Sequence, residues 1–390
     1  MAQFKTIRGI FSIMTSKERH QQRYLRRVEK RKRNKEKVSI YCDNFNVSLS
    51  FTNLYKSYKQ CRKGVGWKAS TQLYKANAIY NVYVTYKRLQ NKTFKSDGFF
   101  EFQIHERGKC RDIKSVTIRE RVVQRCLCDY SLTPMLSRVL IHDNGASSKG
   151  KGYSFSIARL VYHLRKYFNT YGNTGYTLLY DFSKFFDSLQ HWLLKSILAK
   201  TFNDQNLLNL TYHFIDMFGM RGIGLGSQIS QNMALVAVNE LDHYIKERLK
   251  IVGYGRYMDD GYLINQDKNY LHFCLNEITT ICERLEVNIN KKKTHISKID
   301  KGFTYLKIKF QVLPSGKILQ RIDPKSVTRM RRKLKKFVAF VKSGKMTLND
   351  VYQSYQSWRS HTAKLDAYRT RQNMENLYQK LFGGNNVQNS

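Results

Sequence analysis

Two adjacent aspartates between short apolar runs constrain this chain more than any other feature. Asp259 and Asp260 follow Gly253-Tyr-Gly-Arg-Tyr-Met258 and precede Gly261-Tyr-Leu-Ile264. This pattern predicts a strand, a tight turn and a second strand, with the aspartates at the tip. Two neighbouring carboxylates repel each other, so the arrangement suits a divalent cation. An ordinary hairpin turn is the alternative, because aspartate also favours turns.

The charge balance indicates a polyanionic partner. The 390 residues include 69 Lys or Arg against 29 Asp or Glu, which gives a formal net charge of +40. Nucleic acid is the expected partner, and an acidic membrane surface is the weaker alternative. The sequence has no apolar run long enough to span a membrane and no apolar signal region at its start. We therefore expect a cytoplasmic protein without a membrane partner.

The composition and the scarcity of proline predict one contiguous, multi-lobed globular body. The chain is 42% hydrophobic and has only three prolines, so no proline-rich linker separates independent domains. Its seven cysteines are scattered without the repeated spacing of a zinc site, which indicates reduced, mostly structural thiols.

Basic segments near the N-terminus are candidate nucleic-acid contacts. Residues 16–37 predict a helix capped by Ser16, and their eleven Lys or Arg, Arg26 and Arg27 among them, favour an arm along phosphates over a solvated helix. Residues 51–95 predict further helices. Lysines and arginines alternate there with aromatic residues. This pattern suits a single strand of nucleic acid, whose bases stack on the rings, or equally a solvent-exposed helix face. The expected buried positions are Leu54, Tyr55, Tyr58, Leu73, Tyr74, Ala78, Tyr80, Tyr83 and Leu89.

Two further segments combine cations with a geometry that suits phosphate. Lys109 and Arg111 lie two residues apart on or just before a predicted strand, hence on one face, where they can clamp a triphosphate. Residues 142–152 hold three glycines around Lys149 and Lys151, before a helix expected from Tyr153. Glycines let backbone N–H groups approach phosphate, so this loop predicts a template or nucleotide contact. A flexible basic loop is the alternative.

A third carboxylate ends a predicted buried strand. Tyr176–Tyr180 form a short apolar run, and Asp181 follows it. A charge at the end of a buried strand is costly unless it binds something. Phe186 lies five residues on and can fold beneath the same ligand. Three glycines at 222–226 precede a helix expected from 227 or 230, and they permit close backbone approach to a flat ligand or simply form a loop.

The remaining third of the chain predicts a helix, strands and a basic bundle. Residues 269–286 form the helix, Ile289 and Ile296 belong to interrupted strand runs, and residues 303–312 alternate as a strand. Beyond Pro324 the chain is helical again. Arg331 and Arg332 make one of these helices strongly basic, as in a lobe that grips a duplex or in a plain basic bundle.

Asp181, Asp259 and Asp260 together suggest a metal-dependent centre. Their hard oxygen ligands favour Mg²⁺, with Mn²⁺ as the alternative. Two such ions can activate a 3′-hydroxyl and stabilise a leaving pyrophosphate. Phosphoryl transfer of this kind needs mostly positioning and charge neutralisation, which a basic chain supplies.

At these residues the sequence resembles a reverse transcriptase. Tyr257-Met258-Asp259-Asp260 is similar to the catalytic hairpin of that family, and Asp181-Phe182-Ser-Lys-Phe-Phe186 to the motif of its first metal ligand. The resemblance implies that the nucleotide site includes the sugar-discriminating Phe186 together with Phe182, Tyr257 and Met258.

Other motifs of the family follow in order over roughly residues 50–380. Residues 225–231, ending in Gln231, resemble the motif that packs against nucleotide and template. Asn290 and Lys293-Thr294 resemble the next motif, whose lysine is the candidate proton donor to pyrophosphate. Residues 303–310, with Leu306, resemble the primer grip, and Lys109 and Arg111 resemble the fingers strand that holds the triphosphate.

The resemblance implies an α+β fold: a right-hand polymerase of fingers and palm, with an antiparallel palm sheet and a helical C-terminal thumb. The expected parts are a basic N-terminal arm at 1–45, fingers with part of the palm at 46–170, the palm at 171–315 and the thumb at 316–390. The implied enzyme is an RNA-directed DNA polymerase, a nucleotidyltransferase that makes cDNA from a structured partner RNA by two-metal transfer. Its partners would be the RNA template, a DNA primer and product, dNTPs, and an accessory protein or a second copy of the chain.

Within the family the chain looks most like the prokaryotic, group II intron-like lineage. Ser230-Gln231 stands where group II intron and retron enzymes usually carry Ser-Pro, and is similar to reverse transcriptases of diversity-generating retroelements. One alternative is an antiphage (antiviral) defence enzyme that makes DNA from its own noncoding RNA or without a template, because residues 144–152 resemble such enzymes too. The other is a non-catalytic, maturase-like RNA-binding protein.

Overall fold

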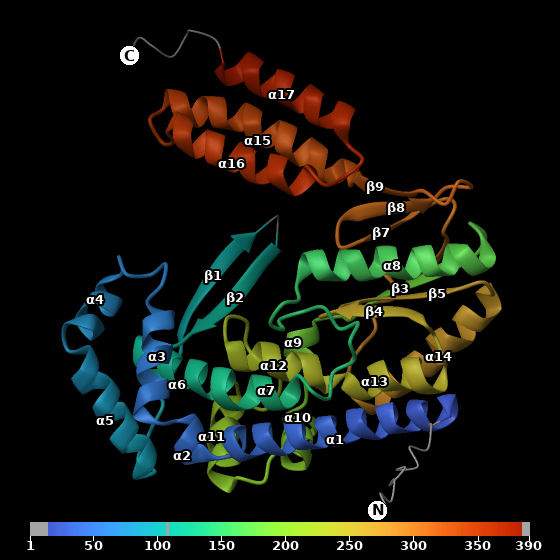
Figure 1. Ribbon diagram of the computed structural model, residues 1–390. Helices are drawn as coiled ribbons and strands as arrows, with labels where there is room; N and C mark the ends of the chain where they lie inside the picture. The colour runs from blue at the N-terminus through green and yellow to red at the C-terminus, as the bar shows by residue number, and fades with distance from the viewer. Residues whose placement is uncertain (1–14, 107–108, 384–390) are drawn as a thin grey trace, which may run out of the picture. The chain divides into compact units, whose positions relative to one another are not determined.

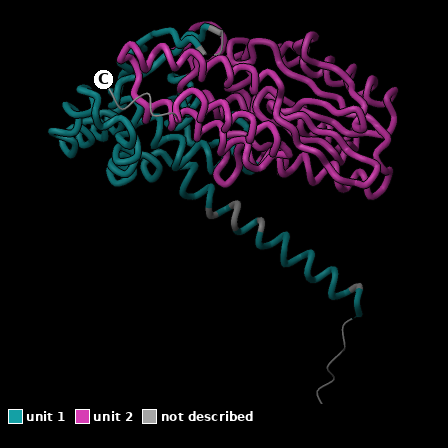
Figure 2. Tube along the Cα trace, turned by 90° about the horizontal axis from the view of Figure 1, so that it is seen from above, with its two compact units in different colours: residues 1–138, 198–214, 227–229 teal, residues 139–197, 215–226, 230–390 magenta. Residues whose placement is uncertain are grey.

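The computed structural model describes residues 15–106 and 109–383, and the chain forms two compact units (Figure 2). Unit 1 comprises residues 1–138, 198–214 and 227–229. Unit 2 comprises residues 139–197, 215–226 and 230–390. The predicted α+β class and antiparallel sheet are confirmed.

Unit 1 is mainly helical and carries one two-stranded antiparallel hairpin (Figure 1). The hairpin consists of β1 (Phe100–Glu106) and β2 (Lys109–Ser115). Its helices are α1 (Ser16–Cys42), α2 (Phe45–Ser48), α3 (Phe51–Cys61), α4 (Ala69–Ala76), α5 (Ala78–Gln90), α6 (Ile118–Leu127), the π-helix η1 (Cys128–Leu132) and α7 (Thr133–Leu136). Three more helices have residues in both units: α10 (His191–Thr201), α11 (Gln205–Asp216) and α12 (Gln228–Ala237).

The predicted basic helix is present as α1, with a different cap. Thr15, not Ser16, is the N-cap, because its hydroxyl accepts from the Glu18 N–H while the Glu18 carboxylate accepts from the Thr15 N–H. Every described side chain from Thr15 to Glu36 is exposed, as expected for a helix without an apolar stripe. Asp43, just beyond its C-terminal end, accepts from the backbone N–H groups of Asn203 and Asp204.

The predicted burial pattern of residues 51–95 is partly wrong. Leu54, Tyr58, Tyr74 and Leu89 are buried, but Leu73, Tyr80 and Tyr83 are exposed and Val82 is buried. The chain forms three helices here, separated by a turn at residues 62–68 and a break at Asn77. Each break resets the helical phase, so a single periodic pattern cannot predict which side of α4 and α5 faces the core.

Unit 2 is built on a four-stranded antiparallel sheet in the order β4-β5-β3-β6. Its strands are β3 (Tyr176–Asp181), β4 (Gly253–Tyr257), β5 (Asp260–Asn265) and β6 (His295–Lys298). One face packs on α8 (Tyr153–Tyr171) and on a second antiparallel sheet of β7 (Phe303–Tyr305), β8 (Ile308–Val312) and β9 (Ile318–Ile322). The other face packs on α14 (Lys268–Arg284), and α13 (Asn239–His243) contacts β4 through the Asp242–Arg256 ion pair (Figure 1). The short helix α9 (Phe185–Ser188) follows β3 in the chain, and the π-helix η2 (Tyr244–Arg248) follows α13.

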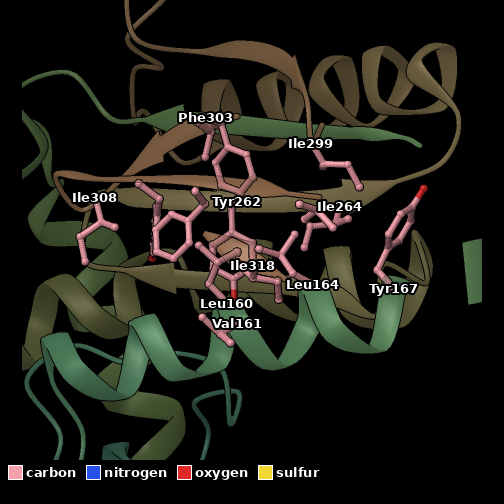
Figure 3. Close-up of a cluster of buried hydrophobic side chains, with 14 residues drawn as sticks. Leu160, Val161, Leu164, Tyr167, Tyr262, Ile264, Ile299, Phe303, Ile308 and Ile318 are labelled. Atoms are coloured by element: carbon pink, nitrogen blue, oxygen red, sulfur yellow. The ribbon is translucent and has the colours of Figure 1, made fainter. Parts of the chain in front are cut away.

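The main core of unit 2 lies between α8 and the two sheets (Figure 3). Leu160 and Leu164 of α8 meet Tyr262 and Ile264 of β5, because alternate residues of a strand face the same side. The Tyr262 ring lies over Gly255 of the neighbouring strand, where a Cβ would come within 2.6 Å of its hydroxyl. This cross-strand tyrosine–glycine contact keeps the two strands of the aspartate hairpin closely packed.

Two strand predictions are wrong in detail. The run at residues 303–312 is a hairpin, because Leu306 and Lys307 form its turn with φ values of 46° and 66°. Positive φ at both central residues is typical of the two-residue turns that suit twisted strands. Ile289 forms only an isolated bridge with Phe182 and belongs to no strand.

The predicted C-terminal helices are confirmed as α15 (Pro324–Lys342), α16 (Leu348–Thr362) and α17 (Tyr368–Phe382). They bury their own apolar core around Leu334, Tyr355 and Met374. Within unit 2, Asp366 holds this bundle to β9: its N–H donates to the Gln320 carbonyl at 2.8 Å and its carboxylate accepts from the Gln320 N–H at 2.8 Å. In the described part of the chain, no helix is both long and apolar enough to cross a membrane.

Candidate active site

The sheet of unit 2 brings the three predicted aspartates together. Asp181 and Asp260 are direct cross-strand partners at the ends of β3 and β5. The Phe182 N–H donates to the Asp259 carbonyl at 3.3 Å, so the turn of the hairpin lies against the end of β3. Side chains of directly opposed residues point to the same face, about 5 Å apart at Cβ. The side chains of Asp181 and Asp260 therefore meet on one face of the sheet.

A buried arginine supports the hairpin turn from within. Met258 has a φ of 54°, and its carbonyl accepts from Nη1 of Arg256 at 2.9 Å. The same guanidinium makes a two-pronged ion pair with Asp242 of α13, from Nη2 to Oδ2 at 2.6 Å and from Nε to Oδ1 at 2.8 Å. Both side chains are fully buried. Tyr254 adds a hydrogen bond to Asp242, and Tyr180 one to Tyr254.

The charges of this buried pair are mutually satisfied. Burial works against the charged guanidinium, but the Asp242 carboxylate outweighs it and raises the pKa of Arg256. Sequence reasoning missed both residues. The available signal was Arg256 itself, a charged residue within a strand that is expected to be buried. A buried charge of this kind needs a partner of opposite charge.

A loop after α14 closes on Asp181. The Asn290 N–H donates to the Asp181 carbonyl at 2.7 Å, and its side-chain amide reaches Oδ2 of the same residue at 3.1 Å. Nζ of Lys293 donates to this Oδ2 at 2.8 Å. Burial opposes the ammonium, but the hydrogen bond with Asp181 and the nearby aspartates outweigh it and raise the pKa of Lys293. The predicted Asn290 and Lys293 thus lie beside the first predicted metal ligand.

The carboxylates carry more negative charge than their surroundings tolerate. Burial, followed by the charges of Asp259 and Asp181, raises the pKa of Asp260 to about 7, although Lys293 opposes the shift. A divalent cation would relieve this repulsion, so the donor set fits Mg²⁺ or Mn²⁺. Among residues 15–106 and 109–383, however, no three His, Cys, Asp or Glu side chains are gathered closely enough to form a ready ion site.

The aromatic residues after Asp181 differ in accessibility. Phe182 is buried between Tyr180 and Phe185, with ring centroids 5.5 and 5.0 Å away. Phe186 is half-buried, and its carbonyl accepts from the Ile223 N–H at 2.9 Å. Gly222 has a φ of 77°, and a Cβ there would come within 2.8 Å of the Asp187 carbonyl. Gly222 thus packs closely on the backbone next to Phe186, and the predicted approach of this stretch to a flat ligand stays a prediction.

The glycine loop at residues 142–152 runs beside β4. The Arg256 N–H donates to the Asp143 carbonyl at 3.1 Å, and the Gly145 N–H donates to the Arg256 carbonyl at 3.0 Å. Ser147 of the loop donates to the exposed Gln231 at 3.2 Å. The Lys151 ammonium is held by two carbonyls of its own loop, those of His142 and Asn144. Lys149 is exposed.

The other predicted contact residues lie elsewhere in the two units. In unit 2, Tyr257 and Leu306 pack against the main core, and the Leu306 carbonyl accepts from the Tyr153 hydroxyl at 3.1 Å. Arg331 and Arg332 are exposed on α15. In unit 1, Arg26 and Arg27 are exposed on α1. Lys109 pairs in register with Glu106, and the exposed Arg111 pairs with Ile104.

Solved telomerase structures resemble this chain at a distance. Telomerase from Candida albicans, solved with a fragment of telomeric RNA, is 13% identical, with 68% of this chain and 55% of that chain covered and a TM-score of 0.45. Apo telomerase from Candida tropicalis is 12% identical, with 63% and 53% covered and a TM-score of 0.46. The chain spans about half the length of these telomerases. No curated protein matches the sequence.

A family model provides the assignment. The model described as reverse transcriptase (RNA-dependent DNA polymerase) matches residues 97–310, more than half of the 390 residues. The matched range contains Asp181, Asp259, Asp260 and Lys293. The predicted family and the predicted enzyme class, a nucleotidyltransferase, are thereby confirmed. This chain belongs to the reverse transcriptase family, the RNA-dependent DNA polymerases.

Proposed function

We propose that this chain copies a structured partner RNA into DNA at the ends of β3 and β5. The supporting observation is the register pairing of Asp181 with Asp260, next to Asp259 in the turn. Asp181, Asp259 and Asp260 are the residues that would hold Mg²⁺, or Mn²⁺ in its place. The bound metal would supply Lewis-acid chemistry there, for the primer 3′-hydroxyl and for the charge of the leaving pyrophosphate.

The protein's own groups position the substrates and move one proton. Lys293, kept protonated by Asp181 and the other aspartates, donates a proton from Nζ to the leaving pyrophosphate. Phe186 faces the sugar, and Gln231 contacts the nucleotide and template. Phe182, Tyr257 and Met258 shape the nucleotide site, Phe182 from a buried position. Lys109 and Arg111 hold the triphosphate.

Basic residues outside the catalytic centre hold the nucleic acid strands. We propose that Lys149 binds the template directly. Lys151 holds its loop in shape through hydrogen bonds to two loop carbonyls, and it contributes to template binding in this way. Leu306 supports the primer, Arg331 and Arg332 grip the duplex, and Arg26 and Arg27 pair with phosphates of the partner RNA. For the domains we propose an arm at 1–45, fingers with part of the palm at 46–170, the palm at 171–315 and the thumb at 316–390.

Primer extension tests the activity. Purified protein with an annealed primer, an RNA template, dNTPs and Mg²⁺ should extend the primer, and chelation by EDTA should stop extension. The double variant Asp259→Ala/Asp260→Ala should not extend, whereas the surface variant Asp300→Asn should extend like the parent protein. Equal extension by the double variant would reject this catalytic centre. A protein that binds RNA but never extends a primer would instead be of the non-catalytic, maturase-like kind.

For the biological role, we propose a prokaryotic diversity-generating retroelement. The support is Ser230-Gln231 and the motifs around Asp181, which resemble enzymes of such elements. Sequencing the RNA and cDNA that copurify with the chain tests the proposal, together with any accessory protein or second copy. A template repeat with a matching variable repeat near the gene is the expected result. A noncoding RNA encoded beside an isolated gene would indicate antiphage defence instead.

A further inference from the structure

Helices α3, α4 and α5 of unit 1 leave an aromatic surface uncovered. Leu73 is 76% exposed, Tyr80 68% and Trp67 75%, and Ile79 and Tyr83 are exposed as well. We call these residues, with the groove described below, the α3–α5 surface. A stable unit rarely exposes so many large apolar groups within one short segment unless a partner uses them.

The charge of this segment is one-sided. Residues 44–96 contain ten lysines and arginines and not one aspartate or glutamate. Three of the lysines lie over aromatic rings: Lys59 is 4.7 Å from the Tyr55 centroid, Lys68 5.5 Å from Trp67 and Lys87 5.6 Å from Tyr83. Cations interleaved with rings attract an anion that also has flat faces.

The same helices form a groove, which Ile79, Tyr80 and Tyr83 help to line. Its volume is about 670 Å³, within the range of ligand sites. Tyr58 is buried and forms part of its wall, while the exposed Tyr80 and Tyr83 and the half-buried Tyr55 contribute ring faces. Arg62 and Lys75 are the cations of its lining. Rings and cations therefore line one concave surface together.

We propose that the α3–α5 surface binds a single strand of nucleic acid, with bases stacked on tyrosine rings and phosphates paired with lysines and arginines. A duplex hides the base faces, so it would use the cations but not the rings. A protein partner fits less well, because the centres of protein interfaces are depleted in lysine. The rings accept any base, and the surface therefore predicts little sequence preference, whether the strand is RNA or DNA.

This binding does not depend on the polymerase reaction, so it is tested on the full chain without dNTPs. Oligouridine and oligothymidine strands carrying 5-iodouracil are bound at physiological salt, irradiated, and the cross-linked peptides identified by mass spectrometry. We expect cross-links within residues 51–90, at Tyr80 or Tyr83. The RNA and DNA probes show which kind of strand the surface prefers.

Matched variants separate stacking from general basicity. Tyr80→Ala/Tyr83→Ala should lose these cross-links and bind oligouridine at least about tenfold more weakly in fluorescence anisotropy. Tyr80→Phe/Tyr83→Phe keeps both rings and should bind like the parent protein, and so should Tyr352→Ala, which removes an exposed tyrosine of α16. Circular dichroism and thermal melting verify that each variant is folded.

Three results would overturn the proposal. The first is cross-linking that maps only outside residues 51–90. The second is unchanged affinity of the double alanine variant. The third is a blunt RNA duplex that competes for the cross-links as well as a single strand of the same length does. Any of these results would indicate that the α3–α5 surface binds a duplex or a protein partner instead. Because binding is scored without catalysis, an inactive polymerase would not affect the outcome.

Discussion

Two charge clusters lie at the same hairpin of unit 2, and they are built in opposite ways. Arg256 and Asp242 form a closed cluster: both are fully buried, and their charges meet in a two-pronged ion pair. Asp181, Asp259 and Asp260 form an open cluster, where burial and mutual repulsion raise the pKa of Asp260 to about 7. The closed cluster holds the Met258 carbonyl of the turn that carries Asp259.

The difference separates support from chemistry. A buried charge with a full set of partners stabilises one geometry and has little left to offer a ligand. Carboxylates that are held close together repel each other, and binding a cation would relieve this repulsion. The hairpin thus places a satisfied, buried ion pair within a few residues of the crowded carboxylates that we propose as the catalytic centre. The predictions below perturb these two clusters and a third charge cluster around Asp143.

The largest effect is expected when the open cluster loses a carboxylate. Asp181→Asn removes a proposed metal ligand but keeps an acceptor for Lys293 and Asn290. The rate of primer extension should fall on the order of a thousandfold. The melting temperature should change by no more than a few degrees, because this carboxylate also repels Asp260. Extension assays at saturating Mg²⁺ and thermal melting measure the two quantities, and a rate within tenfold of the parent protein would contradict the assignment.

Breaking the closed cluster should reverse this pattern, with a large loss of stability. Arg256→Met leaves the Asp242 carboxylate buried without its cation, which costs about 3–5 kcal/mol of unfolding free energy. Urea unfolding followed by circular dichroism measures this loss.

The double variant Arg256→Met/Asp242→Leu shows what the closed cluster does besides stabilise. It should regain much of the stability, because it leaves neither charge alone in the core. Primer extension should stay slow, since the hydrogen bond to the Met258 carbonyl is still missing. Full recovery of both stability and extension would show that Arg256 does not position the hairpin.

The open cluster was largely predictable from sequence, and the closed one was not. Asp181, Asp259 and Asp260 stand at the ends of strands that short apolar runs predict, and β3 and β5 pair as expected of an antiparallel sheet. Asp242 and Arg256 lie 14 residues apart on a helix and a strand, and nothing local links them. Pairing of this kind depends on which faces of two elements meet, which a single sequence does not specify.

The same limit explains the errors in unit 1 and at residues 303–312. The exposed Leu73 and Tyr80 fit a helical apolar pattern, but the breaks at residues 62–68 and at Asn77 change the phase of the helices. Leu306 and Lys307 adopt positive φ without the glycine or asparagine that usually marks such a turn. The turn at Leu306 and Lys307 therefore has no sequence signal. Gly64 and Gly66 do mark the break at residues 62–68, but they do not specify the phase of the helix that follows.

A smaller effect is expected at the lysine that touches the open cluster. Lys293→Ala removes the proposed proton donor but leaves all three aspartates, so the extension rate should fall about a hundredfold. The loss should shrink when the leaving group is a weaker base than pyrophosphate, which dNTP analogues with an altered β,γ-bridge provide. Lys292→Ala, an exposed neighbour, is the control and should extend normally. An equal loss with every analogue would argue against proton donation by Lys293.

The smallest effect concerns a third cluster, around Asp143, which is closed but contains a titratable ring. The Asp143 carboxylate accepts from Arg159 at 2.6 Å and Lys246 at 2.9 Å, and His163 lies 3.6 Å away. Burial lowers the pKa of His163 to about 4; Asp143 opposes this, and Lys246, Arg159 and Lys166 add to it. The ring also contacts the Tyr262 hydroxyl at 3.0 Å.

The sign of the pH effect follows from proton counting. An unfolded chain, with a histidine pKa near 6.5, binds more protons than the folded one between pH of about 6.5 and about 4, so stability falls as the pH falls through this window. We expect His163→Gln to lose about 1–2 kcal/mol less than the parent protein between pH of about 7 and about 5, measured by urea unfolding. His213→Gln, at an exposed position, should lose as much as the parent protein. Equal acid sensitivity of His163→Gln and the parent would mean that His163 is protonated without cost. The Asp143 cluster would then tolerate an added positive charge, as we propose for the open cluster, and would differ from the closed one.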